Sequence, residues 1–125
     1  MIILGDELIP YEDVYNINSI EDIKSTKANS LVAFDYDEKI LKYCFENSVR
    51  CLVKVENIKE AIYCNCLNAT YTASEFQISA LIQKLADNYM FDTKNLCIIE
   101  TNDSFVDVAN SEIDGAIYSF LLDNK

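Results

Sequence analysis

The sequence predicts an α/β fold, a three-layer sandwich whose mostly parallel sheet of five to seven strands carries helices on both faces. Two observations lead to this prediction. Short apolar runs recur along the whole chain, as expected for strands that are covered on both faces. Amphipathic helical patterns lie between these runs, and alternating strands and helices form βαβ units with right-handed crossovers.

Seven apolar runs are predicted as strands, and they cover residues 1–4, 13–17, 31–34, 51–55, 70–73, 96–99 and 116–121. Most are short and apolar on both faces, which is typical of the inner strands of a parallel sheet. The gap between the first two runs is too short for a full crossover helix. This short gap favours antiparallel pairing of those two strands.

Helical periodicity is clearest in residues 38–47 and 76–89. In the first segment one stripe is formed by Ile40, Leu41, Cys44 and Phe45. In the second segment the stripe is formed by Ile78, Leu81, Ile82, Leu85 and Tyr89. Apolar residues at this spacing share one face of a helix, so both stripes are expected to pack on the sheet.

A further pattern recurs three times, beginning at Asn18, Asn57 and Asn102. Each asparagine, or its neighbour, is expected to cap a helix at its N-terminus. Each helix is then expected to end at a left-handed residue, namely Asn29, Asn68 or Gly115. The predicted sheet-facing pairs are Ile20 with Ile23, Ile58 with Ile62, and Phe105 with Val108.

Composition indicates one compact domain over residues 1–125, of a Rossmann-like or flavodoxin-like kind. Half of the residues are hydrophobic, a quarter are charged, and Pro10 is the only proline. These values are typical of a globular protein, and no segment has the composition of a linker. The N-terminus turns acidic within seven residues and so does not resemble a secretory signal. No apolar run approaches the roughly 20 residues that a spanning helix needs.

The net charge of −11 limits the classes of partner. Such a surface repels phosphate backbones and anionic lipids, so neither nucleic acid nor membrane is expected as a partner. A basic protein or a metal ion is compatible with it. The five cysteines have no disulfide-scaffold spacing, which indicates reduced thiols and a cytoplasmic location.

The residues that are missing exclude several activities. The chain has no histidine, which excludes His-dependent catalytic triads and His-ligated zinc sites. It has two glycines, Gly5 and Gly115, too few for a glycine-rich phosphate loop. Cys64 and Cys66 lie in a predicted helix, where positions i and i+2 are about 200° apart, so they are expected to point in different directions.

Two carboxylates follow the predicted strand 31–34. Asp35 and Asp37 would lie at the carboxyl edge of a parallel sheet, where functional sites of such sheets are found. Paired carboxylates can hold Mg²⁺, and one can attack a phosphoryl group while the other moves a proton. The simpler interpretation is that they are solvated loop residues that cap the next helix.

The strand followed by Asp35-x-Asp37 resembles the first motif of haloacid-dehalogenase-type phosphatases. The segment from Asp103 to Gly115 is similar to the last motif of that family. The resemblance implies Asp35 as nucleophile, Asp37 as acid/base, and Asp103, together with Asp107, as ligands of Mg²⁺. The Ser/Thr of the second motif is absent after residues 51–55, where Glu56 and Asn57 stand, and the lysine of the third motif has only loosely placed counterparts.

The opening MIILGDE also resembles the first strand and acidic pair of response-regulator receiver domains. This resemblance implies that Asp35 accepts a phosphoryl group and that Asp6 and Glu7 hold Mg²⁺. The Thr/Ser and Lys of that family are missing after the matching strands. The candidate metal ligands are therefore Asp6, Asp35, Asp37 and Asp103, and the candidate catalytic residues are Asp35 and Asp37.

Both resemblances lack the hydroxyl and lysine groups that stabilise a phosphoryl transition state. The sequence therefore favours a non-enzymatic domain that needs no cofactor and acts through protein–protein contact. Eight tyrosines support this prediction, since tyrosine is favoured at interfaces, and self-association as a homodimer is compatible with them. The alternative is a phosphoryl-transfer enzyme or phosphoacceptor that depends on Mg²⁺.

Overall fold

The computed structural model describes residues 1–122. Seven strands form one sheet in which every neighbouring pair is parallel. They are β1 (Ile2–Leu4), β2 (Val14–Asn16), β3 (Leu31–Asp35), β4 (Cys51–Lys54), β5 (Tyr71–Ser74), β6 (Lys94–Ile99) and β7 (Gly115–Tyr118). The order across the sheet is β1-β7-β6-β5-β4-β3-β2, so β2 to β7 follow one another in chain order and β1 adds to the far side of β7.

Helices connect the strands. The α-helices are α1 (Ile20–Lys24), α2 (Glu38–Glu46), α3 (Ile58–Cys66), α4 (Phe76–Tyr89) and α5 (Phe105–Asn110). Two short 3₁₀ helices are η1 (Asn102–Ser104) and η2 (Ser119–Leu121). The strand predicted over 116–121 therefore ends at Tyr118, and its last three residues turn into η2.

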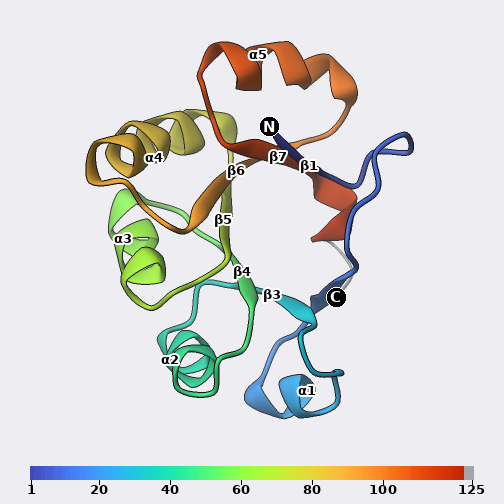
Figure 1. Cartoon of the computed structure of the whole chain (residues 1–125), viewed down its shortest axis with the longest axis vertical. Helices are drawn as coiled ribbons and strands as arrows, with labels where there is room; N and C mark the ends of the chain where they lie inside the picture. The colour runs from blue at the N-terminus through green and yellow to red at the C-terminus, as the bar shows by residue number, and fades with distance from the viewer. Residues whose placement is uncertain (123–125) are drawn as a thin grey trace.

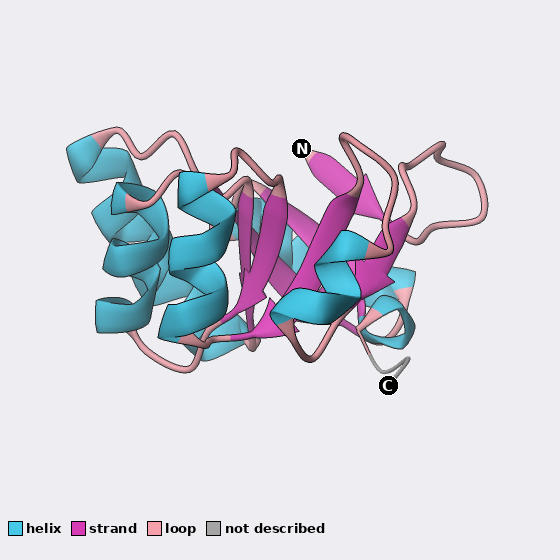
Figure 2. Cartoon of the chain, turned by 90° about the horizontal axis from the view of Figure 1, so that it is seen from below, coloured by secondary structure: helices cyan, strands magenta, loops and turns pink. Residues whose placement is uncertain are grey.

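The sheet is curled, and its two covering layers are unequal. Figure 1 shows the five α-helices on the outer side of the curl, with η2 on the inner side and residues 5–13 crossing from β1 to β2. Figure 2 shows helices standing side by side against the strands, with the long loop on the opposite side. The predicted three-layer α/β class with a sheet of five to seven mostly parallel strands is confirmed, and the sheet has seven strands, all parallel. Within residues 1–122 the five α-helices lie on one face, and the helix on the other face is the short η2. Because successive right-handed crossovers advance in one direction, they place the α-helices on the same face.

Successive side chains of each strand point to opposite faces of the sheet and so belong to different apolar cores. On the outer face Val32, Phe34 and Val53 pack with buried residues of α2, α3 and α4. On the inner face side chains from six strands meet one another and Leu122; they are Leu4, Leu31, Ala33, Leu52, Ala73, Leu96 and Ile117. The period-2 alternation of the strands thus gives each face of the sheet its own apolar core.

The predicted helix caps are mostly confirmed. Asn57 Oδ1 accepts a hydrogen bond from Glu60 N (2.9 Å), and Ser19, the neighbour of Asn18, caps α1. Asn29 and Asn68 take the left-handed conformation with φ of 67° and 61°. The prediction for Gly115 is wrong: the left-handed residue after α5 is Glu112, with φ of 55°. Gly115 is already in β7, where it pairs with Ile2.

The antiparallel pairing favoured for the first two strands is also wrong. β1 pairs with β7 and β2 pairs with β3, at opposite edges of the sheet. The connection between them needs no crossover helix, because residues 5–13 cross the open side of the curl instead (Figure 1). The fold joins the first strand of the chain to the last.

Gly115→Ala is expected to destabilise the fold by about 1–3 kcal/mol, the usual range for overpacking. A Cβ at position 115 would lie 2.2 Å from the Ile2 carbonyl oxygen, which is strand backbone and cannot move aside without breaking the β1–β7 pairing. Urea unfolding measures the effect. Glu112→Gly is the control in the same loop, and it should stabilise the protein because glycine is unstrained at positive φ. Unchanged stability of Gly115→Ala would contradict the packing described.

Candidate functional site

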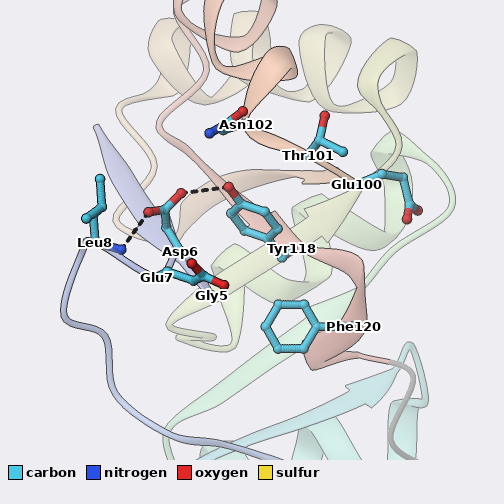
Figure 3. A pocket seen from close by; sticks show the side chains of 9 residues that line it. All are labelled: Gly5, Asp6, Glu7, Leu8, Glu100, Thr101, Asn102, Tyr118 and Phe120. Atoms are coloured by element: carbon cyan, nitrogen blue, oxygen red, sulfur yellow. Dashed lines mark hydrogen bonds between the residues drawn. The ribbon is translucent and has the colours of Figure 1, made fainter.

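A cleft lies at the carboxyl ends of β1, β6 and β7. It has a volume of about 440 Å³ and is lined by Gly5, Asp6, Glu7, Leu8, Glu100, Thr101, Asn102, Tyr118 and Phe120 (Figure 3). Its position is where β1 interrupts the sequential order of the strands. In open α/β sheets ligands bind outside the carboxyl ends of the strands at such a break. The cleft is therefore the first candidate site.

Gly5 shapes the cleft. Its φ of +107° lies in the region that glycine adopts readily, and the chain turns there directly after β1. A Cβ at position 5 would lie 3.0 Å from Tyr118 Cβ and 3.1 Å from Leu121 Cδ1. The absence of a side chain therefore lets β7 and η2 approach β1 closely enough for Tyr118 to reach the next residue, Asp6.

The Asp6 carboxylate is held by two donors. Tyr118 donates its hydroxyl to Asp6 Oδ2 at 2.6 Å, and the Leu8 backbone N–H donates to Oδ1 at 2.9 Å (Figure 3). The Tyr118 hydrogen bond, assisted by that of Leu8, lowers the pKa of Asp6 below its usual value. The same hydrogen bond raises the pKa of Tyr118 to about 12. At neutral pH the pair is a carboxylate and a neutral phenol.

The chemistry of the cleft is acidic and aromatic. Tyr118 contacts Phe120 with ring centroids 6.1 Å apart, and it meets Phe105 edge to face at 6.3 Å. Asp6, Glu7 and Glu100 supply carboxylates, and among residues 1–122 no basic side chain lines the cleft. Such a surface repels phosphate and other anions. The groups present can accept hydrogen bonds from a polar or cationic molecule, but they cannot stabilise the charge of a transferred phosphoryl group.

The candidate residues from the sequence lie in two separate places. Asp6 is in the cleft, and Asp103 follows Asn102 in η1, where its N–H donates to Thr101 Oγ1 at 3.3 Å. Asp35 ends β3, which is separated from β6 by β4 and β5. Asp37 caps α2, with Oδ1 accepting from Ile40 N at 3.0 Å, as the simpler interpretation predicts. Within residues 1–122 no three His, Cys, Asp or Glu side chains are grouped so as to hold a metal ion.

The thiols do not gather into a metal site either. Cys64 is fully buried and Cys66 is exposed, which confirms that the two point in different directions. Cys44 of α2 and Cys51 of β4 are both buried and share a side-chain hydrogen bond. This bond, together with burial, raises the pKa of Cys51. All five cysteines are free.

A second hollow, the α2–α3 groove, has a volume of about 380 Å³. It is lined by Tyr36, Glu38, Leu41, Lys42, Phe45, Glu46, Tyr63 and Leu67. The sequence analysis placed Phe45 in the core stripe of its helix, yet this side chain is 45% exposed, and Tyr63 is 48% exposed. Ile40, Leu41 and Cys44 bury the sheet-facing side of α2, while Phe45 lies one step further round the helix and borders the groove.

The sheet-facing side of α3 was predicted wrongly. Ile58 and Ile62 are 38% and 41% exposed, and the helix buries Ala61 and Cys64 instead. At 100° per residue, these buried positions lie between two apolar flanks, one of Ile58 and Ile62 and one of Tyr63 and Leu67. The residues of α3 that are buried against the rest of the fold are therefore the two small ones, Ala61 and Cys64. One signal in the sequence could have indicated the groove. Phe45 on α2 and Tyr63 on α3 are apolar residues just outside the buried stripes of two successive helices.

Tyr36 closes one end of the groove. Its hydroxyl donates to Glu38 Oε2 at 3.5 Å, and the residue is partly buried between α2 and α3. Burial, and then the negative charge of Glu38 and Glu60 among other groups, raises the pKa of Tyr36 to about 12. The groove thus combines an apolar lining with an anionic end.

Comparison with known proteins gives no family for this chain. No family model matches the sequence, and no curated protein is significantly similar to it. In the part of the chain that the structure describes, no helix is both long and apolar enough to cross a membrane. Function must therefore be argued from the two hollows and their side chains.

Tyr118→Phe is expected to raise the pKa of Asp6 toward 3.8, because it removes the hydroxyl donor. Asp6→Asn should conversely lower the pKa of Tyr118 from about 12 toward 10. A group whose pKa is raised by folding stabilises the fold below its unfolded pKa, so the contribution of Tyr118 is lost as pH rises from about 10 to 12. Carboxyl-carbon NMR and phenolate absorbance follow the two titrations.

The control is Tyr15→Phe, since Tyr15 lies on β2 at the other edge of the sheet. It should leave the titration of Asp6 unchanged. An Asp6 pKa that is the same in Tyr118→Phe and in the unmodified protein would show that the hydrogen bond does not form in solution.

Proposed function

We propose that this chain is a non-enzymatic domain that binds a basic protein partner through the α2–α3 groove. One observation carries the proposal: Phe45 and Tyr63 stand on opposite walls of an apolar groove and remain 45% and 48% exposed. Exposed aromatic residues around a hollow are typical of protein interfaces. The net charge of −11 favours a partner of opposite charge.

The remaining parts of the proposal follow from charge and thiol chemistry. The acidic surface makes nucleic acid an unfavourable partner. Five free cysteines are compatible with the reducing cytoplasm, where we place the protein. No cofactor is required for this function. Self-association is less favourable, because two copies would each bring a charge of −11.

A photo-crosslinking amino acid at position 45 tests the proposal in cells of the source organism. We expect one discrete adduct with a basic protein, identified by mass spectrometry, that is lost when Tyr63→Ser is added. The matched control is the same crosslinker at Val106, an apolar residue of α5 that is 65% exposed. Equal adducts from both positions, an adduct with a second copy of the chain, or no adduct would contradict the proposal.

A second candidate, Mg²⁺-dependent phosphoryl transfer or phosphate acceptance, is favoured by one contact in the sheet. Asp35 lies in register with Lys54 at the carboxyl ends of β3 and β4. A carboxylate nucleophile beside an ammonium group is a plausible phosphoacceptor arrangement, because the ammonium offsets the charge of the phosphoryl group. Asp37 is less suited to a catalytic role, since its carboxylate already caps α2.

This second candidate requires that Mg²⁺ raise the melting temperature of the protein, since a bound ion stabilises the folded state. The rise should be absent from Asp35→Asn and present in Asp13→Asn, which changes an exposed carboxylate before β2. Identical melting curves with and without Mg²⁺ would rule out a metal site at Asp35.

A further inference from the structure

The two walls of the α2–α3 groove have the geometry of a helix-binding site. On α2 the half-exposed Phe45 lies one turn from Leu41, which lines the groove from its buried side. Tyr63 and Leu67 are one turn apart at the end of α3. Rows of side chains four residues apart form ridges along a helix, and the space between two such ridges accepts the ridge of a third helix. The nine residues of α2 span about 13 Å, which is enough to contact two to three turns of a partner helix.

The rim of the groove has a regular charge pattern. Glu38, Lys42 and Glu46 line the groove and are successively four residues apart, so they form one row along α2. Successive charges in this row are about 6 Å apart along the axis. The complementary row on a helix lying alongside is basic, acidic and basic at the same spacing.

The end of the groove strengthens the requirement for a basic partner. Tyr36 lies there with its hydroxyl on Glu38, and the charges of Glu38 and Glu60 act on it. Negative charge therefore lies close to Tyr36, where we place one end of the partner segment. A positively charged residue at that end of the segment offsets it.

We infer that the groove receives an amphipathic helix of the partner protein, which inserts two apolar side chains one turn apart and presents a basic, acidic and basic row to α2. This inference rests on the proposed protein-binding function and specifies the partner. A second copy of the chain is a poor occupant. Its own α2 row would set Glu38 and Glu46 against the same residues of the first copy.

Selection from two displayed peptide libraries tests the inference. One library keeps a helix-forming scaffold with eight randomised positions on one face, and the other is unstructured and rich in glycine and proline. We expect binders from the helical library only, with apolar residues at i and i+3 or i+4. Lys or Arg should be enriched at two flanking positions one turn to either side of an acidic residue.

The selected helix is then measured against variants of the protein. Phe45→Ser should weaken binding about tenfold or more, and Val106→Ser should leave it unchanged. Both substitutions change exposed side chains, and circular dichroism verifies that each variant is folded. Equal binding to Phe45→Ser and the unmodified protein would overturn the inference.

Charge reversal tests the row itself. The double variant Glu38→Lys with Glu46→Lys should weaken the selected peptide about fivefold, and a peptide with Glu in place of its two basic residues should regain that loss. Identical affinities of both peptides for both proteins would overturn the charge pattern.

The results separate this inference from the function on which it rests. A crosslinked partner at position 45, together with binders only from the unstructured library, overturns the helix inference and leaves the protein-binding function standing. Helical binders that depend on Phe45, without any crosslinked partner in cells, overturn the function and support the helix-binding geometry.

Discussion

The pairing of β1 with β7 is the constraint on which the rest of the structure depends. Gly115 makes it possible, because its missing side chain leaves room for the Ile2 backbone. Asp114, the residue before Gly115, is held in place by its carboxylate. This group accepts hydrogen bonds from Asn95 N (2.9 Å) and from Gln83 Nε2 (3.2 Å). The Asp114 carbonyl then accepts the Ile2 N–H at 3.0 Å. A polar network on α4 and β6 thus presents the edge of β7 to the first strand.

This pairing creates both the inner core and the acidic cleft. Adding β1 beyond β7 brings Leu4 into contact with the inner-face residues of the other strands. It also interrupts the strand order at one place, and the cleft lies there. Gly5 then turns the chain so that Asp6 meets Tyr118. Asn16 Nδ2 donates to the Leu121 carbonyl at 2.7 Å, which ties β2 to η2 across the opening of the sheet.

The two hollows differ in what they can recognise. In the part of the chain that the structure describes, the cleft is lined by three carboxylates and two aromatic rings and by no basic residue. The α2–α3 groove has an apolar lining with a charged rim, which is the usual anatomy of a protein interface. The fold alone does not choose between them, because one α/β architecture serves many functions. The apolar lining around Phe45 and Tyr63 favours the groove as the proposed binding place for a protein partner.

The sequence by itself determined the features that depend on near neighbours along the chain. All seven strands, the N-cap of α3 at Asn57 and the left-handed residues Asn29 and Asn68 are predictable, because strand patterning, capping and turn preferences involve only a few consecutive residues. Asp37 belongs here too, as the cap of α2. Of the cleft, only Asp6 and Glu7 were singled out from the sequence.

Only the tertiary structure decided which strands pair and which helix flanks stay exposed. Gly115 looked like a helix terminator, and its place opposite Ile2 depends on a residue more than a hundred positions away. Phe45 and Ile62 follow an amphipathic pattern, yet both stay more than 40% exposed, because α2 and α3 bury other residues against the rest of the fold. Hydrophobic periodicity tells which residues favour burial. The area that the sheet and the neighbouring helices offer decides which of these residues are buried. Phe45 and Tyr63 are not, and they line the α2–α3 groove.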